Sequence, residues 1–205
     1  MNAIQLNDTH PTVSIPELVR LLMNEGKSFD DALDIARRTF SYTNHTLMSE
    51  ALETWDCELF RSVIPNILDI IFRINDALHR ELTSRGLPQE KINSMYIVAD
   101  GRIHMARLAT FVSSYVNGVA QIHSGLLRTE VLKDWYDVYP ERFQNKTNGV
   151  TQRRFLGLCN PALSTLIGSR IGYGFMTDLY ELKKLEPLID DELIRGFICL
   201  LYTSD

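Results

Sequence analysis

Polar side chains gather at four places where their types and spacing could do chemistry. The first is Asn7-Asp8-Thr9-His10, which follows a short apolar segment. Residues two apart in an extended segment face the same side, so Asp8 and His10 could present a carboxylate and an imidazole together. Such a pair can orient sugar hydroxyls. The alternative is that Asp8 or Thr9 is a turn or capping residue and that His10 is a partly exposed loop histidine.

The second and third clusters are Asn44-His45-Thr46 and the pair Glu50 and Glu53. The Asn44-His45-Thr46 cluster follows aromatic and β-branched residues that predict an extended segment. Glu50 and Glu53 lie three residues apart, and a helix beginning at Ser49 would place both carboxylates on one face. Paired carboxylates divide the acid and base roles in many glycosidases. Acidic residues are also typical of the first turn of a helix.

The fourth cluster, Lys146-Thr147-Asn148-Gly149, is typical of a turn in which Asn148 or Gly149 takes a positive φ. One lysine beside one glycine lacks the spacing of a phosphate-binding P-loop. None of the six lysines lies in an apolar stretch suited to Schiff-base chemistry. The sequence therefore predicts no nucleophile and no metal site, and the cluster is interpreted as a connector.

The elements that must position these clusters are mainly helices. Apolar residues at intervals of three and four, with start and stop signals, predict helices at residues 14–26, 28–40, 65–82, 103–115, 124–134 and 161–171. Only residues 3–6, 42–45 and 94–98 indicate strands. Since so small a sheet would bury little, the chain is either mainly α-helical or a piece of a larger α/β protein.

The composition excludes several classes of protein. With 21 basic and 26 acidic residues the chain has a formal charge of −5, which argues against a nucleic-acid partner. The longest apolar run, residues 67–72, is far shorter than the ~20 residues of a membrane span, and no signal peptide is indicated. Three widely spaced cysteines predict buried free thiols in a reducing, cytoplasmic setting: Cys57, Cys159 and Cys199.

Five sequence motifs of the chain resemble motifs of the α-1,4-glucan phosphorylases, the family of glycogen, starch and maltodextrin phosphorylases. They occur in the family's order and at about its spacing, and the likeness runs from about Ala3 to beyond Asp190. The strings are QLNDTHP at residues 5–11, YTNHTL at 42–47, EALE at 50–53, VNGVA at 116–120 and FQNKTNGV at 143–150.

The resemblance implies phosphate-dependent removal of one glucosyl unit from an α-1,4-glucan, with retention of configuration and release of glucose 1-phosphate. The family's pyridoxal 5′-phosphate is held on a lysine. His45 and Asn148 correspond to family residues that bind the glucosyl unit around its 6-hydroxyl, so their polar atoms should lie within about 8 Å of each other. Asp8, His10 and Glu53 correspond to a polar pocket beside the anomeric carbon.

The implied fold is α/β: a helix-rich fragment, with few strands, of a two-domain, glycosyltransferase-B-like phosphorylase. Residues 1–147 would be the C-terminal part of the N-terminal domain, and residues 148–198 the start of the C-terminal, cofactor domain. The lysine that follows a Gly-Asn-Met triplet and the basic residues for the substrate phosphate do not occur here. The fragment alone is therefore predicted to be inactive, and the whole protein to be a cytoplasmic homodimer.

Residues 199–205 no longer resemble the family. They can be encoded by a sequence like the transposase end used as an adapter in DNA libraries, so we expect a non-native tail. Two rival hypotheses for the function remain at this stage. One is a catalytically inactive carbohydrate-binding or interaction module derived from the family. The other is a sugar-nucleotide glycosyltransferase of similar two-domain shape.

Overall fold

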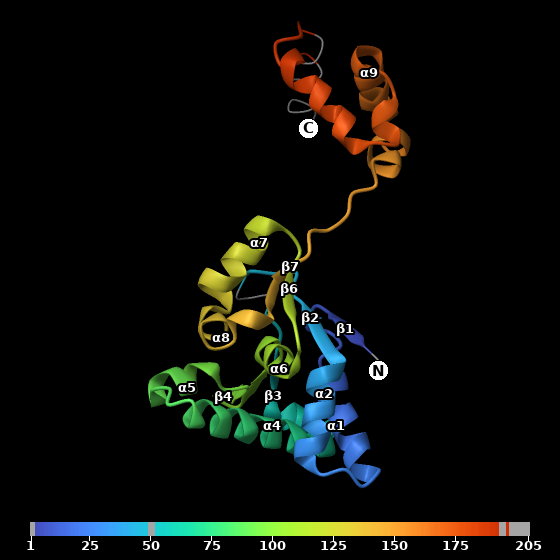
Figure 1. Cartoon of the computed structure of the whole chain (residues 1–205). Coiled ribbons are helices and arrows are strands. Elements are labelled where there is room, and N and C mark those ends of the chain that lie inside the picture. The colour runs from blue at the N-terminus through green and yellow to red at the C-terminus, as the bar shows by residue number, and fades with distance from the viewer. Residues whose placement is uncertain (1–2, 49–51, 193–195, 197–205) are drawn as a thin grey trace. The chain divides into compact units, whose positions relative to one another are not determined.

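The computed structural model describes residues 3–48, 52–192 and 196, which form two compact units, residues 1–148 and 149–205 (Figure 1). Each unit is described here by itself. The assignment of the units to domains of a longer protein stays a prediction, and the proposed tail at 199–205 lies outside the described residues. No helix among the described residues is long and apolar enough to cross a membrane.

A four-stranded parallel sheet organises the first unit. Its strands are β1 (Ile4–Asn7), β2 (Phe40–Thr43), β6 (Val116–Gly118) and β7 (Phe143–Asn145), in the spatial order β1-β2-β6-β7. Ile4 pairs with Phe40, Tyr42 with Val116, and Val116 with Phe143. Parallel neighbours need long crossover connections, and helices supply them here.

The crossovers divide the helices of this unit into three groups (Figure 1). Helices α1 (Ser14–Asn24) and α2 (Phe29–Thr39) join β1 to β2. Between β2 and β6 lie α3 (Cys57–Val63), α4 (Pro65–Ser84), α5 (Gln89–Met95) and α6 (Met105–Val112). Between β6 and β7 lie α7 (Gln121–Leu126), the π-helical turn η2 (Leu127–Val131), α8 (Lys133–Val138) and the 3₁₀ turn η3 (Pro140–Arg142).

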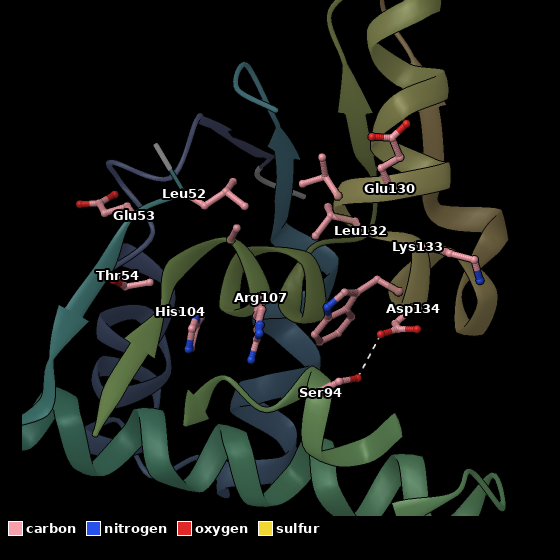
Figure 2. A pocket seen from close by; sticks show the side chains of 13 residues that line it. Leu52, Glu53, Thr54, Ser94, His104, Arg107, Glu130, Leu132, Lys133 and Asp134 are labelled. Atoms are coloured by element: carbon pink, nitrogen blue, oxygen red, sulfur yellow. Dashed lines mark hydrogen bonds between the residues drawn. The ribbon is translucent and has the colours of Figure 1, made fainter. Parts of the chain in front are cut away.

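A second, antiparallel sheet lies within the β2-to-β6 crossover. It consists of β3 (Thr54–Asp56), β5 (Arg102–His104) and β4 (Val98–Ala99). Asp100 and Gly101 join β4 to β5 with φ values of 51° and 72°. Positive φ at both positions matches the strand twist of a two-residue hairpin. Asn75 of α4 accepts hydrogen bonds from the Ile97 and Val98 amides, and this ties the sheet to α4, which runs beneath it in Figure 2.

Helix α4 confirms the helix predicted from Pro65. Its buried face carries the periodic apolar residues Ile67, Leu68, Ile70, Ile71, Ile74, Leu78 and Leu82. Gly86 takes a φ of 75° just after the helix, and its amide donates to the Thr83 carbonyl. This is a common way for a helix to end, because glycine adopts the left-handed conformation without steric cost.

Four helical elements are defined within residues 149–192, the continuous described part of the second unit. The π-helical turn η4 (Arg153–Leu158) is followed by α9 (Pro161–Ile171), which has the predicted bounds and is capped by the Asn160 side chain. The 3₁₀ segments η5 (Gly174–Met176) and η6 (Leu179–Leu188) complete the described part of this unit. Phe175 is its fully buried aromatic residue.

Several expectations about secondary structure are wrong. Of residues 94–98, Ser94 and Met95 end α5 and only Val98 lies in a strand, β4, and residues 124–134 are interrupted by a π-helical turn. The helix expected from residue 103 is preceded by β5. Four strands were not predicted because each has only three residues or stands beside a turn signal: β3, β5, β6 and β7.

Local details also differ from the expectations. Glu53 lies outside any helix, directly before β3, because its backbone carbonyl accepts from Met105 at the edge of the antiparallel sheet. Its expected helical partner Glu50 is outside the described residues. Ser28 caps α2 as its sequence suggests, whereas Ser14 donates to the Pro11 carbonyl and does not cap α1. Cys57 is buried and free, but Cys159 is exposed.

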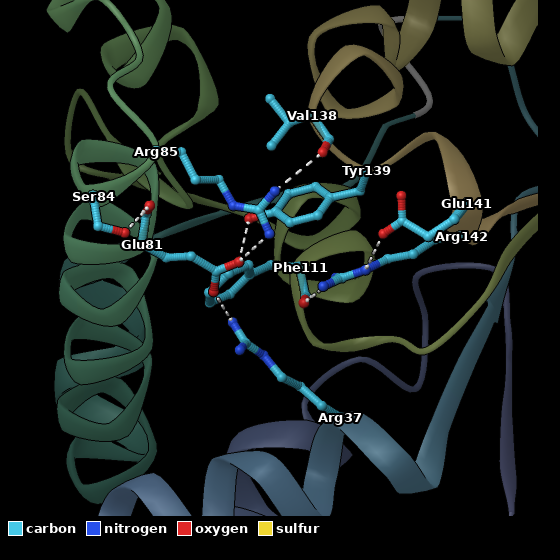
Figure 3. Close-up of polar contacts among 9 residues, drawn as sticks. All are labelled: Arg37, Glu81, Ser84, Arg85, Phe111, Val138, Tyr139, Glu141 and Arg142. Atoms are coloured by element: carbon cyan, nitrogen blue, oxygen red, sulfur yellow. Dashed lines mark hydrogen bonds and ion pairs between the residues drawn. The ribbon is translucent and has the colours of Figure 1, made fainter.

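Glu81 connects three of the crossover elements (Figure 3). Its carboxylate pairs with Arg37 of α2 at 2.7 Å and accepts from the Tyr139 hydroxyl at 2.8 Å, and Arg85 lies 3.3 Å away. The Tyr139 ring lies against the guanidinium groups of Arg85 and Arg142. Burial alone would raise the pKa of Glu81, but Arg37 and Tyr139 outweigh it and hold this pKa below its usual value.

We predict that Glu81→Gln destabilises the chain by about 2 kcal/mol, because it leaves Arg37 partly buried without its carboxylate. Urea unfolding followed by circular dichroism measures the change. The matched control is Glu58→Gln, which removes an exposed ion pair with Arg61 and should cost less than about 0.5 kcal/mol. Equal effects of the two substitutions would contradict the connecting role of Glu81.

Candidate functional site

The candidate site lies at the carboxyl edge of the parallel sheet. All four strands run in the same direction, so their last residues share one edge: Asn7, Thr43, Gly118 and Asn145. A polar segment follows three of these residues, Asn7, Thr43 and Asn145. In open α/β sheets, ligands bind outside the carboxyl ends of the strands. The sheet therefore gathers segments that are far apart in the sequence where a ligand is expected.

Backbone hydrogen bonds continue beyond the strand ends and hold these segments side by side. They run from the Asp8 amide to the Thr43 carbonyl (2.9 Å), from Asn44 to Asn117 (2.9 Å), from Lys146 to Gly118 (3.2 Å) and from Asn148 to Val119 (2.9 Å). Thr43 also donates from its hydroxyl to the Asn117 side chain at 2.9 Å. The segments that bear His45 and Asn148 are thus both fixed to the strand β6 that lies between them.

His45 presents an exposed imidazole at this edge. Its Nε2 atom lies 2.6 Å from the Asn7 side-chain oxygen at the end of the neighbouring strand. The preceding Asn44 is buried and donates to the Tyr42 hydroxyl at 3.0 Å. Burial raises the pKa of that hydroxyl far above its usual range, so it stays neutral. The buried, hydrogen-bonded Asn44 therefore directly precedes the exposed His45.

Residues 8–10 form a bend and not an extended segment. Asp8 has a φ of 63°, and its side chain accepts from the Thr9 amide at 3.0 Å. The argument that Asp8 and His10 share a face by strand alternation is therefore wrong, because alternation requires an extended backbone. The alternative that made Asp8 a turn residue describes it correctly.

The bend brings His10 and Thr9 to Glu53, 44 residues away. The Thr9 hydroxyl donates to Glu53 at 2.8 Å, and His10 Nδ1 lies 3.8 Å from the same carboxylate oxygen. The other oxygen of Glu53 accepts from the Trp55 indole at 2.8 Å. Both oxygens are thus held by neutral donors, which fixes the direction of the carboxylate.

Pockets flank Glu53 on two sides. A pocket of about 230 Å³ is lined by Thr9, His10 and Trp55 together with apolar side chains of α3. A larger pocket of about 560 Å³ lies between the antiparallel sheet and α8 and includes Glu53, His104 and Arg107 (Figure 2).

Asn148 is the last residue of the first compact unit, and its own amide donates to the Val119 carbonyl. Strands β2 and β7 lie on either side of β6, so two strand spacings, about 10 Å, separate the starts of the segments that bear His45 and Asn148. Side chains of this size can meet one ligand across that distance. The expected approach of their polar atoms stays a prediction.

His104 and Arg107 were not singled out from the sequence, although both line the larger pocket. Arg107 donates to the Tyr96 carbonyl at 2.7 Å, and burial lowers its pKa. Burial lowers the pKa of His104 to about 4, and the neighbouring cations Arg107 and Arg102 contribute to this shift. The Asp100-Gly101 pair was the signal that could have placed them, because it predicts the hairpin that carries β5 and the start of α6.

The chain is similar to proteins of known family. The chain matches the family described as "Carbohydrate phosphorylase" over residues 1–198. It therefore belongs to the carbohydrate phosphorylase family.

The similar proteins are glycogen phosphorylases, which confirms the resemblance found in the sequence. The chain is 50% identical over 200 residues to the brain form of Bos taurus, a match that covers 94% of the chain and 24% of that protein. It is 47% identical to the human brain form over 197 residues and to the human muscle form over 195, each match covering 93% of the chain and 23% of the relative. The chain thus spans about a quarter of the length of these relatives.

The pKa of His104 predicts acid sensitivity of the fold. Between about pH 6.5 and pH 4 the unfolded chain binds a proton at this residue and the folded chain does not, so the free energy of unfolding should fall as the pH falls through this window. One proton corresponds to at most about 1.4 kcal/mol per pH unit. Urea unfolding at several pH values should show a shallower dependence in His104→Gln, and identical slopes in the two proteins would contradict the buried, neutral histidine.

Proposed function

We propose that this chain is part of an α-1,4-glucan phosphorylase, which transfers the terminal glucosyl unit of the glucan to inorganic phosphate and releases glucose 1-phosphate. The chain would contribute the pocket for that glucosyl unit. The observation that carries the proposal is the shared carboxyl edge of the parallel sheet, where Asp8, His10, His45 and Asn148 follow three different strands. Membership of the family supplies the reaction class.

His45 and Asn148 would bind the glucosyl 6-hydroxyl from two sides. The imidazole can donate or accept one hydrogen bond, and the amide can do both. Each segment is fixed to β6 by backbone hydrogen bonds, so little ordering is needed when the sugar binds. The role of these residues is to hold the sugar in place for attack, and not to transfer protons.

Glu53 and His10 would act beside the anomeric carbon. A positive charge develops on this centre in an oxocarbenium-like transition state, and a fixed carboxylate stabilises such charge. The Thr9 hydroxyl and the Trp55 indole hold Glu53 in one orientation before the substrate arrives. His10 lies within 4 Å of the carboxylate and completes this pocket. The bend at Asp8 brings these groups together.

Pyridoxal 5′-phosphate, the cofactor implied by the resemblance, supplies through its phosphate the proton relay of the reaction when it is bound. The lysines described here do not fit its attachment. Lys91 is held by Asp137 and Asp134, and the five others are exposed: Lys27, Lys133, Lys146, Lys183 and Lys184. The cofactor, the homodimer and the cytoplasmic location are therefore proposals for the whole protein only.

The test uses the complete open reading frame that contains this chain. The purified protein should release glucose 1-phosphate from maltodextrin in the presence of inorganic phosphate, and His45→Ala should lower kcat/KM about 10- to 100-fold through the loss of one positioned hydrogen bond. The matched control is His79→Gln, on α4, which should leave kcat/KM within about twofold. The 205-residue chain alone should show no release.

Two outcomes would contradict this function. A whole protein that binds maltodextrin without releasing glucose 1-phosphate would be a carbohydrate-binding module that has lost catalysis. Activity that requires a sugar nucleotide in place of phosphate would identify a glycosyltransferase.

A further inference from the structure

His123 lies in α7, directly after the carboxyl end of β6, and it is absent from the candidate residues discussed above. Its Nδ1 atom accepts a hydrogen bond from the Val119 amide at 3.2 Å. An imidazole nitrogen that accepts an amide proton carries none itself, so the neutral ring bears its proton on Nε2. That atom is buried and has no hydrogen-bond partner of good geometry among the described residues.

His123 lies close enough to His45 for the two residues to interact electrostatically. Burial lowers the pKa of His123, the His45 imidazole lowers it further, and the His45 backbone opposes both effects. His123 therefore remains neutral near pH 7 and keeps the tautomer that accepts from Val119. The Val119 carbonyl in turn accepts from the Asn148 amide at 2.9 Å. One ring thus lies between the two segments expected to bind the sugar.

The ring of His123 lies close against Gly118. A Cβ atom at Gly118 would collide with His123 Nδ1 and would lie 2.6 Å from the Ser124 hydroxyl, so only glycine allows α7 to approach the strand end this closely. The Ser124 hydroxyl also donates to the Asn145 side chain at 2.7 Å, which holds α7 against the end of β7.

We propose that His123 is a positioning residue for the glucosyl pocket, because it holds the Val119–Asn148 contact and the His45 segment in one fixed arrangement. The proposal rests on the proposed function for the identity of the sugar. The contacts of His123 with the protein do not depend on that function, so they can be tested separately.

The experiment compares two substitutions that differ in whether they keep a hydrogen-bond acceptor for the Val119 amide. His123→Phe keeps a ring of similar size but removes the acceptor, and so leaves the Val119 amide unpaired. His123→Asn loses the ring but keeps a side-chain oxygen that can accept from Val119. His79→Phe is the control, since His79 is a partly buried histidine of α4 that contacts the Tyr96 hydroxyl.

In the 205-residue chain, ¹H–¹⁵N NMR should show faster hydrogen exchange at the Val119 and Asn148 amides in His123→Phe than in His123→Asn. Signals of the His45 ring should shift in His123→Phe and not in His79→Phe. Unchanged exchange and an unchanged His45 ring in His123→Phe would overturn the positioning role, whatever the reaction is.

In the whole protein, His123→Phe should lower kcat/KM for maltodextrin phosphorolysis about tenfold, mainly through a higher KM, and His123→Asn should restore it to within about threefold. Equal losses in both variants at equal thermal stability would overturn the proposal. If the unmodified protein releases no glucose 1-phosphate, the proposed function fails, and the NMR comparison alone decides the role of His123.

Discussion

Parallel strands all end at the same edge of a sheet, and the candidate site of this chain depends on that constraint. The order β1-β2-β6-β7 places the segments after residues 7, 43, 118 and 145 next to one another, although helical crossovers separate them in the sequence. Backbone hydrogen bonds then continue past the strands and join the first residues of these segments to their neighbours. If this edge binds a sugar as proposed, the candidate groups need little reorganisation to meet it.

The crossovers must themselves be held in place, and Glu81 does this with one carboxylate. It joins α4 to α2 through Arg37 and to the end of α8 through Tyr139, while Arg85 and Arg142 cover the tyrosine ring (Figure 3). Since a carboxylate with three partners has its lone pairs satisfied, the desolvation cost of burying it is offset. Helices α2, α4 and α8, one from each crossover, are therefore tied together at this carboxylate.

The sequence predicts the long elements of this fold well and the short ones poorly. Helix α4 repeats its apolar face over 20 residues, and α9 has a proline at its start and a glycine after its end, so periodicity and capping suffice. Strands β3, β6 and β7 have three residues each, too few to show alternation, and they exist because tertiary partners complete them.

The sequence also predicts the candidate site residues unevenly. Spacing alone favoured turn and cap interpretations for Asp8 and Asn148, and only the resemblance of whole strings assigned them to a sugar pocket. The contacts of Thr9 and His10 with Glu53 had no local signal, because they depend on a left-handed Asp8 and on a residue more than 40 positions later in the chain. His123 had no local sequence signal either, since its proposed role comes from the packing of α7 against Gly118.

The register of the sheet also has a consequence for the folding rate. Thr43 meets Asn117 across 74 residues of chain, whereas Gln5 meets Thr43 across 38. Closing a longer loop costs more chain entropy, so the β2–β6 contact is the most expensive one to form and topologies of this kind fold slowly. We expect the β1–β2 and β6–β7 pairs to form early and the β2–β6 pairing to limit the rate. The edge that would bind the sugar is then completed last.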